Sequence, residues 1–276
     1  MNYESARGMY EDYARNKYDA SGITTWKYNA AWPAALTWQY VDWYLRAGGA
    51  YYGAKKACEP LHVQYSYGDH SIYVVNSYYQ DFENLKVTAK VLNFDMSEKY
   101  SRTASVNVSE DSKVRAFTIG WPEGLSQSHF LSLKLHDSAG QEISSNFYWL
   151  STVPDIEGTK GYRTDRTFYV SPKSVADHTD LMKLPRVQLE MFYDIAEREK
   201  ESIASVRITN PSQHLAFQIH LSVTRDEDGG EVTPTYWEDN YFSLLPGESK
   251  EVQARFDPRD LEGARAVVKV NGWNVE

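Results

Sequence analysis

The sequence predicts a mainly β protein in which a short segment of mixed helix and strand precedes two antiparallel β-sandwiches. Two patterns carry this prediction. After Pro60, short stretches of alternating apolar and polar residues recur between turn signals, which is typical of antiparallel strands. Before Pro60, apolar residues recur at steps of three and four, which indicates helices.

The segment before Pro60 predicts a helix, a strand and a second helix. The first helix is predicted over 3–17 from its regularly spaced residues Tyr3, Ala6, Tyr10, Tyr13 and Lys17. Residues 23–28 are β-branched and aromatic and predict a strand. A helix ending at 48–49 follows from the spacing of Trp38, Val41 and Leu45, and 50–57 is also helix-prone.

A single strand has no neighbour with which to pair. We therefore expect residues 1–60 to be a piece of an α/β structure whose other strands lie outside this sequence. We also expect residues 61–276 to fold without that piece.

The rest of the chain predicts two series of strands. The first series is predicted at 61–67, 72–77, 85–94, 104–108, 114–119, 130–136 and 146–150. The second is predicted at 187–193, 202–209, 216–224, 236–244, 251–256 and 266–273. Residues 151–185 are turn-rich and indicate a linker with a strand near 168–170. The number and spacing of strands favour immunoglobulin-like sandwiches, with domains at 1–60, 61–155 and 156–276.

Composition excludes several classes of partner. A net charge of −9 argues against nucleic acid, which needs clustered Lys and Arg. No run of apolar residues is long enough to span a membrane. Cys58 is the one cysteine, so we expect no disulfide and a buried, inert thiol. The histidines are scattered and no phosphate-binding loop occurs, so we expect neither a metal site nor a cofactor.

The predicted strand at 23–28 bears on catalysis. In barrel enzymes the catalytic carboxylates follow the C-terminal ends of strands, and this strand ends without an acid. Asp19 precedes it and Asp42 lies on a predicted helix, so we predict no catalytic residue in this chain.

An indole and an amide at a strand end suit a sugar, because the ring covers C–H faces and the amide bonds hydroxyl groups. We therefore predict Trp26, Asn29 and Trp32 as substrate-binding residues. The alternative is that Trp26 fills a core and Trp32 wedges a loop before Pro33.

Several stretches resemble the family 2 glycoside hydrolases of the exo-β-D-glucosaminidase and β-mannosidase kind. GITTWKYNAAWP at 22–33 and TWQYVDWYL at 37–45 resemble the last strand and last helix of the family's (β/α)8 catalytic barrel, the TIM barrel. YYGAKKACEPLHVQ at 51–64 is similar to the exit from that barrel, and NFYWL at 146–150 to the final strand of the next sandwich. WEDNYFSLLPGE at 237–248 resembles the terminal immunoglobulin-like domain of exo-β-D-glucosaminidases.

The resemblance implies the C-terminal portion of a retaining exo-β-D-glucosaminidase acting on chitosan-type oligosaccharides. Residues 1–60 would then be the C-terminal α/β remnant of the barrel, and the missing barrel region would be this chain's partner. Retaining enzymes use two glutamates, both of which would lie before Met1; Glu4 falls inside a helix. The resemblance therefore implies that the chain is inactive alone, and that Trp26, Asn29 and Trp32 bind carbohydrate in the complete enzyme. A secreted or periplasmic location would follow from the family.

Two alternatives stay open. The chain could belong to a β-mannosidase or endo-β-mannosidase, because the residues that distinguish an amine from an axial hydroxyl lie mostly upstream. It could also be a non-catalytic carbohydrate-binding or structural module, which exposed aromatics such as Tyr78 and Tyr79 would favour.

Overall fold

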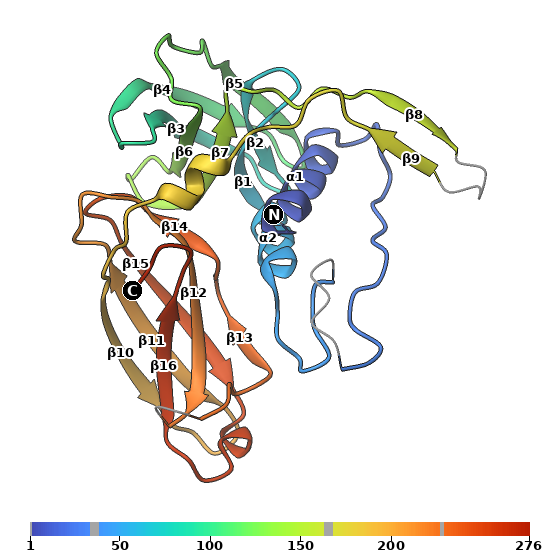
Figure 1. Ribbon diagram of the computed structural model, residues 1–276. Helices are drawn as coiled ribbons and strands as arrows, with labels where there is room; N and C mark the ends of the chain where they lie inside the picture. Colours follow the sequence, from blue (N-terminus) through green and yellow to red (C-terminus); the bar gives the residue numbers. More distant parts are fainter. Residues whose placement is uncertain (1, 34–38, 163–167, 227–228) are drawn as a thin grey trace.

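The computed structural model describes residues 2–33, 39–162, 168–226 and 229–276. Two helices lie between an upper sandwich, blue to green in Figure 1, and a lower sandwich in orange and red. A hairpin of β8 (Thr159–Tyr162) and β9 (Phe168–Ser171) projects from the linker between the sandwiches. No helix within the described ranges is long and apolar enough to cross a membrane.

The first sandwich confirms the first predicted strand series. Its smaller sheet has the order β1-β2-β5 and its larger sheet the order β4-β3-β6-β7. The strands are β1 (Leu61–Tyr65), β2 (Ser71–Asn76), β3 (Phe82–Asn93), β4 (Glu98–Val108), β5 (Lys113–Thr118), β6 (Ser128–His136) and β7 (Glu142–Ser151). Leu131, Leu133 and Leu135 of β6 are fully buried, so the predicted alternation is the core face.

The second sandwich confirms the second series with one change. One sheet has the order β10-β11-β15-β13 and the other the order β14-β12-β16. The strands are β10 (Glu190–Ala196), β11 (Ser202–Thr209), β12 (Ala216–Arg225), β13 (Thr235–Trp237), β14 (Phe242–Leu244), β15 (Ser249–Phe256) and β16 (Ala266–Asn271). The strand predicted at 236–244 is two strands, β13 and β14, which belong to different sheets. Two short 3-10 helices, Thr179–Lys183 and Pro258–Leu261, flank the sandwich.

The N-terminal segment confirms two helices and corrects two other elements. Helix α1 spans Asn2–Arg15 and α2 spans Gly49–Ala57. The strand predicted at 23–28 is wrong, because these residues are irregular. A strand needs neighbours, and among the described residues the nearest pairing is an isolated bridge between Asn29 and Val41. The helix predicted through Val41 and Leu45 is also wrong over 39–48, where a turn closes with the backbone N–H of Leu45 donating to the Asp42 carbonyl at 3.2 Å. Trp38 lies outside the described residues.

The two helices contact each other closely at one glycine. A Cβ added to Gly53 of α2 would lie 2.2 Å from the backbone oxygen of Tyr3 in α1. Gly53 therefore allows the backbones of the helices to approach, as glycine does where no side chain fits.

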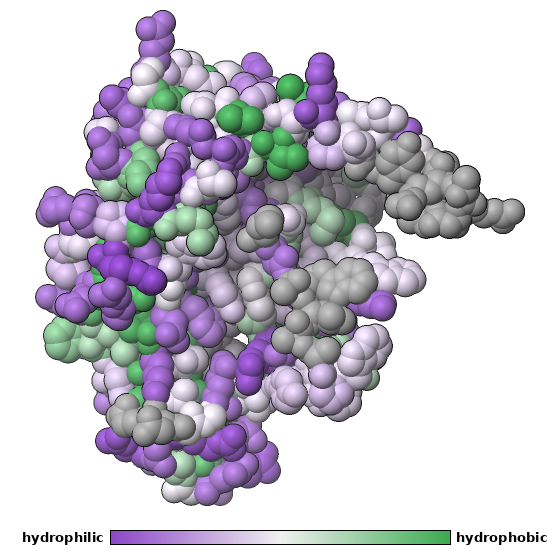
Figure 2. All heavy atoms as spheres, in the orientation of Figure 1, coloured by the Kyte–Doolittle hydropathy of each residue, from purple (hydrophilic) through white to green (hydrophobic). Residues whose placement is uncertain are grey.

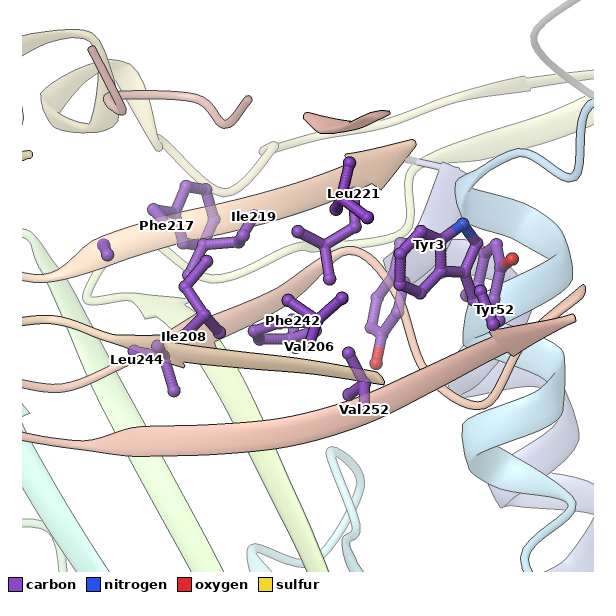
Figure 3. Close-up of a cluster of buried hydrophobic side chains, with 14 of the residues drawn as sticks. Tyr3, Tyr52, Val206, Ile208, Phe217, Ile219, Leu221, Phe242, Leu244 and Val252 are labelled. Carbon is purple, nitrogen blue, oxygen red and sulfur yellow. The ribbon is translucent and has the colours of Figure 1, made fainter. Parts of the chain in front are cut away.

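The helices also share the core of the second sandwich. Tyr3 and Tyr52 belong to the same buried cluster as Val206, Leu221 and Phe242, and Figure 3 shows both tyrosines at the end of that row of side chains. Trp149 of the first sandwich joins this cluster and meets Phe217 edge-on at 5.1 Å. The core of the second sandwich therefore continues into both helices, although we expected residues 61–276 to fold without residues 1–60.

Cys58 corrects a smaller expectation. It follows the last residue of α2 and is exposed, whereas we expected a buried thiol. Its neighbour Ala57 takes the buried position instead.

Candidate functional site

The buried face of α1 carries charge. Tyr3, Arg7 and Glu11 succeed one another at steps of four and therefore stack on one face of the helix. Arg7 and Glu11 are each 1% exposed. The apolar spacing at Tyr10 and Tyr13 predicted a neighbouring face instead, and both of these residues are only partly buried.

Arg7 joins α1 to β7 of the first sandwich. Its Nη1 donates to Asn146 Oδ1 at 2.8 Å and to the carbonyl of Phe147 at 2.5 Å. The guanidinium also lies 4.0 Å from the centre of the Tyr148 ring, a favourable position for a cation over an aromatic face. Glu4 lies 3.4 Å from Arg7 Nη2 and accepts a hydrogen bond from Tyr67.

Glu11 and Glu59 hold His62 between them. The Nε2 of His62 lies 3.0 Å from Glu11 Oε1, and its Nδ1 lies 3.0 Å from Glu59 Oε2. Glu11 also accepts from Asn146 Nδ2 at 2.6 Å and from the Tyr148 hydroxyl at 2.9 Å. His62 is 1% exposed, so these contacts replace water around the ring.

The electrostatics favour a doubly protonated His62. Burial alone would lower the pKa of His62, but the hydrogen bonds to Glu11 and Glu59 outweigh burial and raise that pKa above its ordinary value. Burial pushes the pKa of Glu59 upward, while His62 and Lys56 pull it down to about 2. The protonated form of His62 is therefore favoured by the two acidic side chains that contact it.

The chain of charges continues to the second sandwich. Lys56 Nζ lies 2.7 Å from Glu59 Oε1 and 3.9 Å from Asp239 Oδ2. Asp239 in turn accepts from Lys250 Nζ at 2.6 Å. Burial would raise the pKa of Asp239, but Lys250 and Lys56 hold it below its ordinary value.

This buried network, defined as Arg7, Glu11, Glu59, His62, Asn146 and Tyr148, has the shifted pKa values that often mark active sites. Its groups are paired with one another, and Glu11 and His62 are nearly inaccessible. A substrate cannot reach them, so the arrangement fixes α1 to the sandwich rather than performing a reaction. Sequence reasoning missed it; the spacing of Tyr3, Arg7 and Glu11 was the available signal.

The predicted substrate-binding residues lie apart from this network. Trp26 is 78% exposed and Trp32 is 54% exposed. Asn29 is exposed, and its backbone oxygen accepts from Gln39 Nε2 at 3.1 Å. Among the described residues no hydrogen bond or ring contact joins the three to one another. What they have in common is that they lie close in sequence, in the irregular stretch that follows α1.

The acidic residues considered as catalytic candidates are either exposed to solvent or bonded within the fold. Asp42 Oδ1 accepts from the backbone N–H of Arg46 at 2.9 Å, and Asp19 is exposed. Glu4 lies in α1, as predicted, and burial raises its pKa. Within the described residues, no group of three His, Cys, Asp or Glu side chains could hold a metal ion.

Each of the two sandwiches matches a known protein family. The family described as "Exo-beta-D-glucosaminidase Ig-fold domain" matches residues 167–275, and the one described as "Mannosidase Ig/CBM-like domain" matches residues 68–153. This chain carries the Ig-fold domains of the exo-β-D-glucosaminidase and mannosidase family, glycoside hydrolase family 2.

Individual proteins similar to this chain agree with these family matches. An exo-β-D-glucosaminidase of Streptomyces avermitilis is 38% identical over 99% of the chain and 31% of its own length. The crystal structure of the Amycolatopsis orientalis exo-chitosanase CsxA matches 99% of the chain and 33% of its own, with a TM-score of 0.90 and 33% identity. A mannosylglycoprotein endo-β-mannosidase of Lilium longiflorum is 24% identical over 99% of the chain and 33% of its own length.

The similarity covers only part of each of these relatives. The chain spans about a third of the length of the curated relatives it matches. It is homologous to the C-terminal region of exo-β-D-glucosaminidases, and mannosidases are more distant relatives.

Proposed function

We propose that this chain is the C-terminal portion of a retaining exo-β-D-glucosaminidase that acts on chitosan-type oligosaccharides. The observation that carries the proposal is the match over 99% of the chain, with a TM-score of 0.90, to an enzyme called an exo-chitosanase. The higher identity to a glucosaminidase, 38% against 24% for the lily endo-β-mannosidase, supports the glucosaminide over the mannoside.

In this proposal residues 1–60 are the C-terminal piece of a (β/α)8 barrel, followed by sandwiches at 61–155 and 156–276. The irregular segment, residues 16–33 and 39–48 between α1 and α2, supports this organisation. It exposes large aromatic residues that a folded neighbour would cover. They include Tyr18, Trp26, Tyr28, Trp32, Trp43 and Tyr44. Partner strands from the missing barrel region would allow 23–28 to become a strand.

Catalysis then belongs to the complete enzyme. Retention requires two carboxyl groups about 5–5.5 Å apart, both able to reach the sugar. Glu11 is buried on His62, and Glu4 is engaged by Arg7 and Tyr67. The chain's contribution is to hold α1, and with it the barrel, on the sandwiches, while Trp26, Asn29 and Trp32 line the substrate pocket.

The test of inactivity uses the purified chain. We expect no release of product from chitosan oligomers or aryl β-D-glucosaminides, because Glu11 is buried against His62 and Glu4 is bound by Arg7 and Tyr67. Turnover that persists after Glu4→Gln and Asp19→Asn would show that the catalytic centre lies elsewhere in this chain.

The pocket assignment is tested in the complete enzyme. Trp32→Ala should lower kcat/KM while the circular dichroism spectrum stays unchanged, because the side chain is exposed. Tyr79→Ala is the matched control, since Tyr79 is 86% exposed on the first sandwich and should leave turnover unaffected. Equal turnover by both variants would exclude Trp32 from the pocket.

The mannosidase alternative is separated by substrate. The complete enzyme should cleave an aryl β-D-glucosaminide faster than the corresponding β-D-mannoside. The reverse preference would assign the chain to the mannosidases.

A further inference from the structure

The outer face of the sheet β10-β11-β15-β13 presents an ordered array of side chains. Strand pairing brings Asp194 opposite Ser205 and Ser205 opposite Gln253. The backbone N–H of Glu238 bonds to the carbonyl of Gln253, which extends the row to β13. Asp194, Ser205, Gln253 and Glu238 therefore form one row across β10, β11, β15 and the residue that follows β13, and all four are exposed.

The row lies in a hollow. Ser205 has a short side chain, while longer residues surround it. The hollow has a volume of ≈ 620 Å³ and is lined by Phe192, Tyr193, Asp194, Ser205, Arg207, Glu238, Glu251 and Gln253, with Val206 and Val252 beneath. Small-molecule sites have volumes of this order.

Two aromatic residues stand on either side of the row. Phe192 of β10 precedes Asp194 and is 70% exposed, and Tyr236 of β13 precedes Glu238 and is 63% exposed. The inward-facing Trp237 beside Tyr236 is buried, so the alternation of the strand directs Tyr236 outward. Figure 2 shows one face of the molecule, which is mainly hydrophilic over the lower sandwich and carries hydrophobic residues in small groups.

The face is acidic. Glu190, Asp194, Glu238 and Glu251 supply four acidic groups, against the two arginines Arg207 and Arg255 of β11 and β15. The Glu238 carboxylate accepts the backbone N–H of Gln253 at 3.0 Å. One of the arginines, Arg207, already lies 3.4 Å from Glu251. Asp194 has no ion-pair partner within the described part of the chain, so a cationic ligand would add a favourable contact there.

We propose that this outer face is a second carbohydrate site, one that binds a cationic amino-sugar oligomer along the row from Asp194 to Glu238. An amino sugar offers an apolar C–H face to Phe192, hydroxyl groups to Ser205 and Gln253, and an ammonium group to Asp194. The ligand class rests on the proposed function, but binding here needs no catalysis.

The experiment measures binding to the full 276-residue chain by isothermal titration, using a fully deacetylated chitosan hexamer and its fully N-acetylated counterpart. We expect the deacetylated hexamer to bind, the neutral one to bind at least about tenfold more weakly, and added salt to weaken binding. Equal binding of both hexamers would overturn the assignment of a cationic ligand.

Variants locate the site. Phe192→Ala and Asp194→Asn should each weaken binding about tenfold, and circular dichroism should show intact folds because both side chains are exposed. Met182→Ala and Glu98→Gln, which change an exposed apolar and an exposed acidic side chain outside this face, are controls that should bind as the parent does.

A double variant separates this proposal from the substrate pocket. Trp26→Ala with Trp32→Ala should leave hexamer binding to this chain unchanged. Loss of binding in that variant, with full binding in Phe192→Ala, would place the ligand on the irregular segment and refute the second site. Failure of the complete enzyme to cleave glucosaminides would refute the proposed function without affecting this measurement.

Discussion

His62 lies between two carboxylates where water has little access, and its neighbours decide what its removal would cost. Glu11 and Glu59 contact opposite ring nitrogens, each at 3.0 Å. Breaking a buried pair by removing one partner costs more than the pair contributes, because the other charge is left without compensation.

We therefore predict that His62→Gln lowers the free energy of unfolding by about 3–5 kcal/mol, measured by urea denaturation. Glutamine keeps much of the volume but none of the charge, so Glu11 and Glu59 lose their common cation. His214→Gln is the control, since His214 is exposed and the change should stay within about 0.5 kcal/mol. Equal effects of the two changes would contradict a charged, stabilising His62.

The network also predicts a pH dependence. The folded-state pKa of His62 is above its ordinary 6.5, so its contribution is fully present below pH 6.5 and is lost as pH rises through the folded value. Glu59 is lowered from 4.5 to about 2, so its contribution is present above pH 4.5 and is lost as pH falls toward 2. The difference in urea midpoint between the parent chain and His62→Gln should be largest between these limits. A difference that grows above pH 8 would exclude the imidazolium.

The sequence could not have predicted this network as a unit. The helix that carries Arg7 and Glu11 was predictable, and so was the burial of Tyr3 and Ala6, but the apolar spacing gave no reason to expect two charged residues on its buried face. His62 and Asn146 lie on strands distant in sequence, and only the folded register brings them to the helix. Trp26, Asn29 and Trp32 were found by residue type alone, and their role stays a prediction.

At the scale of elements, α1 and α2 act as one unit because their backbones meet at Gly53. A methyl group there would collide with the Tyr3 carbonyl, 2.2 Å away. We predict that Gly53→Ala lowers the free energy of unfolding by about 1–3 kcal/mol, as overpacking does.

Gly8 of α1 supplies the matched control. A Cβ at Gly8 meets nothing within 4 Å. Gly8→Ala should therefore stabilise the chain by up to about 1 kcal/mol through helix propensity alone, measured by the same denaturation. If Gly53→Ala were also neutral or stabilising, the helices could separate without cost.

Helices and strands could be predicted from the sequence where the strands or helices that they pack against belong to the same chain. The strands of both sandwiches were predictable because alternation and pairing agree, as in β6 between β3 and β7. Residues 23–28 have strand propensity but no adjacent strand, and they are irregular. The stretch 236–244 was predicted as one strand because propensity continues through it, whereas Tyr241 has a positive φ of 57° between β13 and β14.

At the scale of the whole molecule, the helices hold the two sandwiches together. Tyr3 and Tyr52 enter the core of the second sandwich, and the network fixes α1 to the first. Lys134 of the first sandwich also lies 2.9 Å from Glu248 of the second. The boundary between 60 and 61 therefore separates residues that share a core.

We predict that residues 61–276 prepared alone unfold at a lower temperature than the full chain and bind an apolar dye. Removing the helices exposes the core around Val206 and Phe242 and leaves His62 without Glu11. Scanning calorimetry of both chains measures the effect. Identical transitions would show that the helices do not stabilise the sandwiches, whereas the expectation that residues 61–276 fold without residues 1–60 stays a prediction in either case.

The place of Tyr52 also limits how the second sandwich can be recombined with other proteins. A terminal domain that borrows an aromatic side chain from a distant helix is not an interchangeable module, because its interior is completed by its host. A chimera that grafts residues 156–276 onto another protein should express well only if the host carries a large aromatic residue at the position of Tyr52. An exchange of this sandwich between related proteins would then have to include the helix α2 as well.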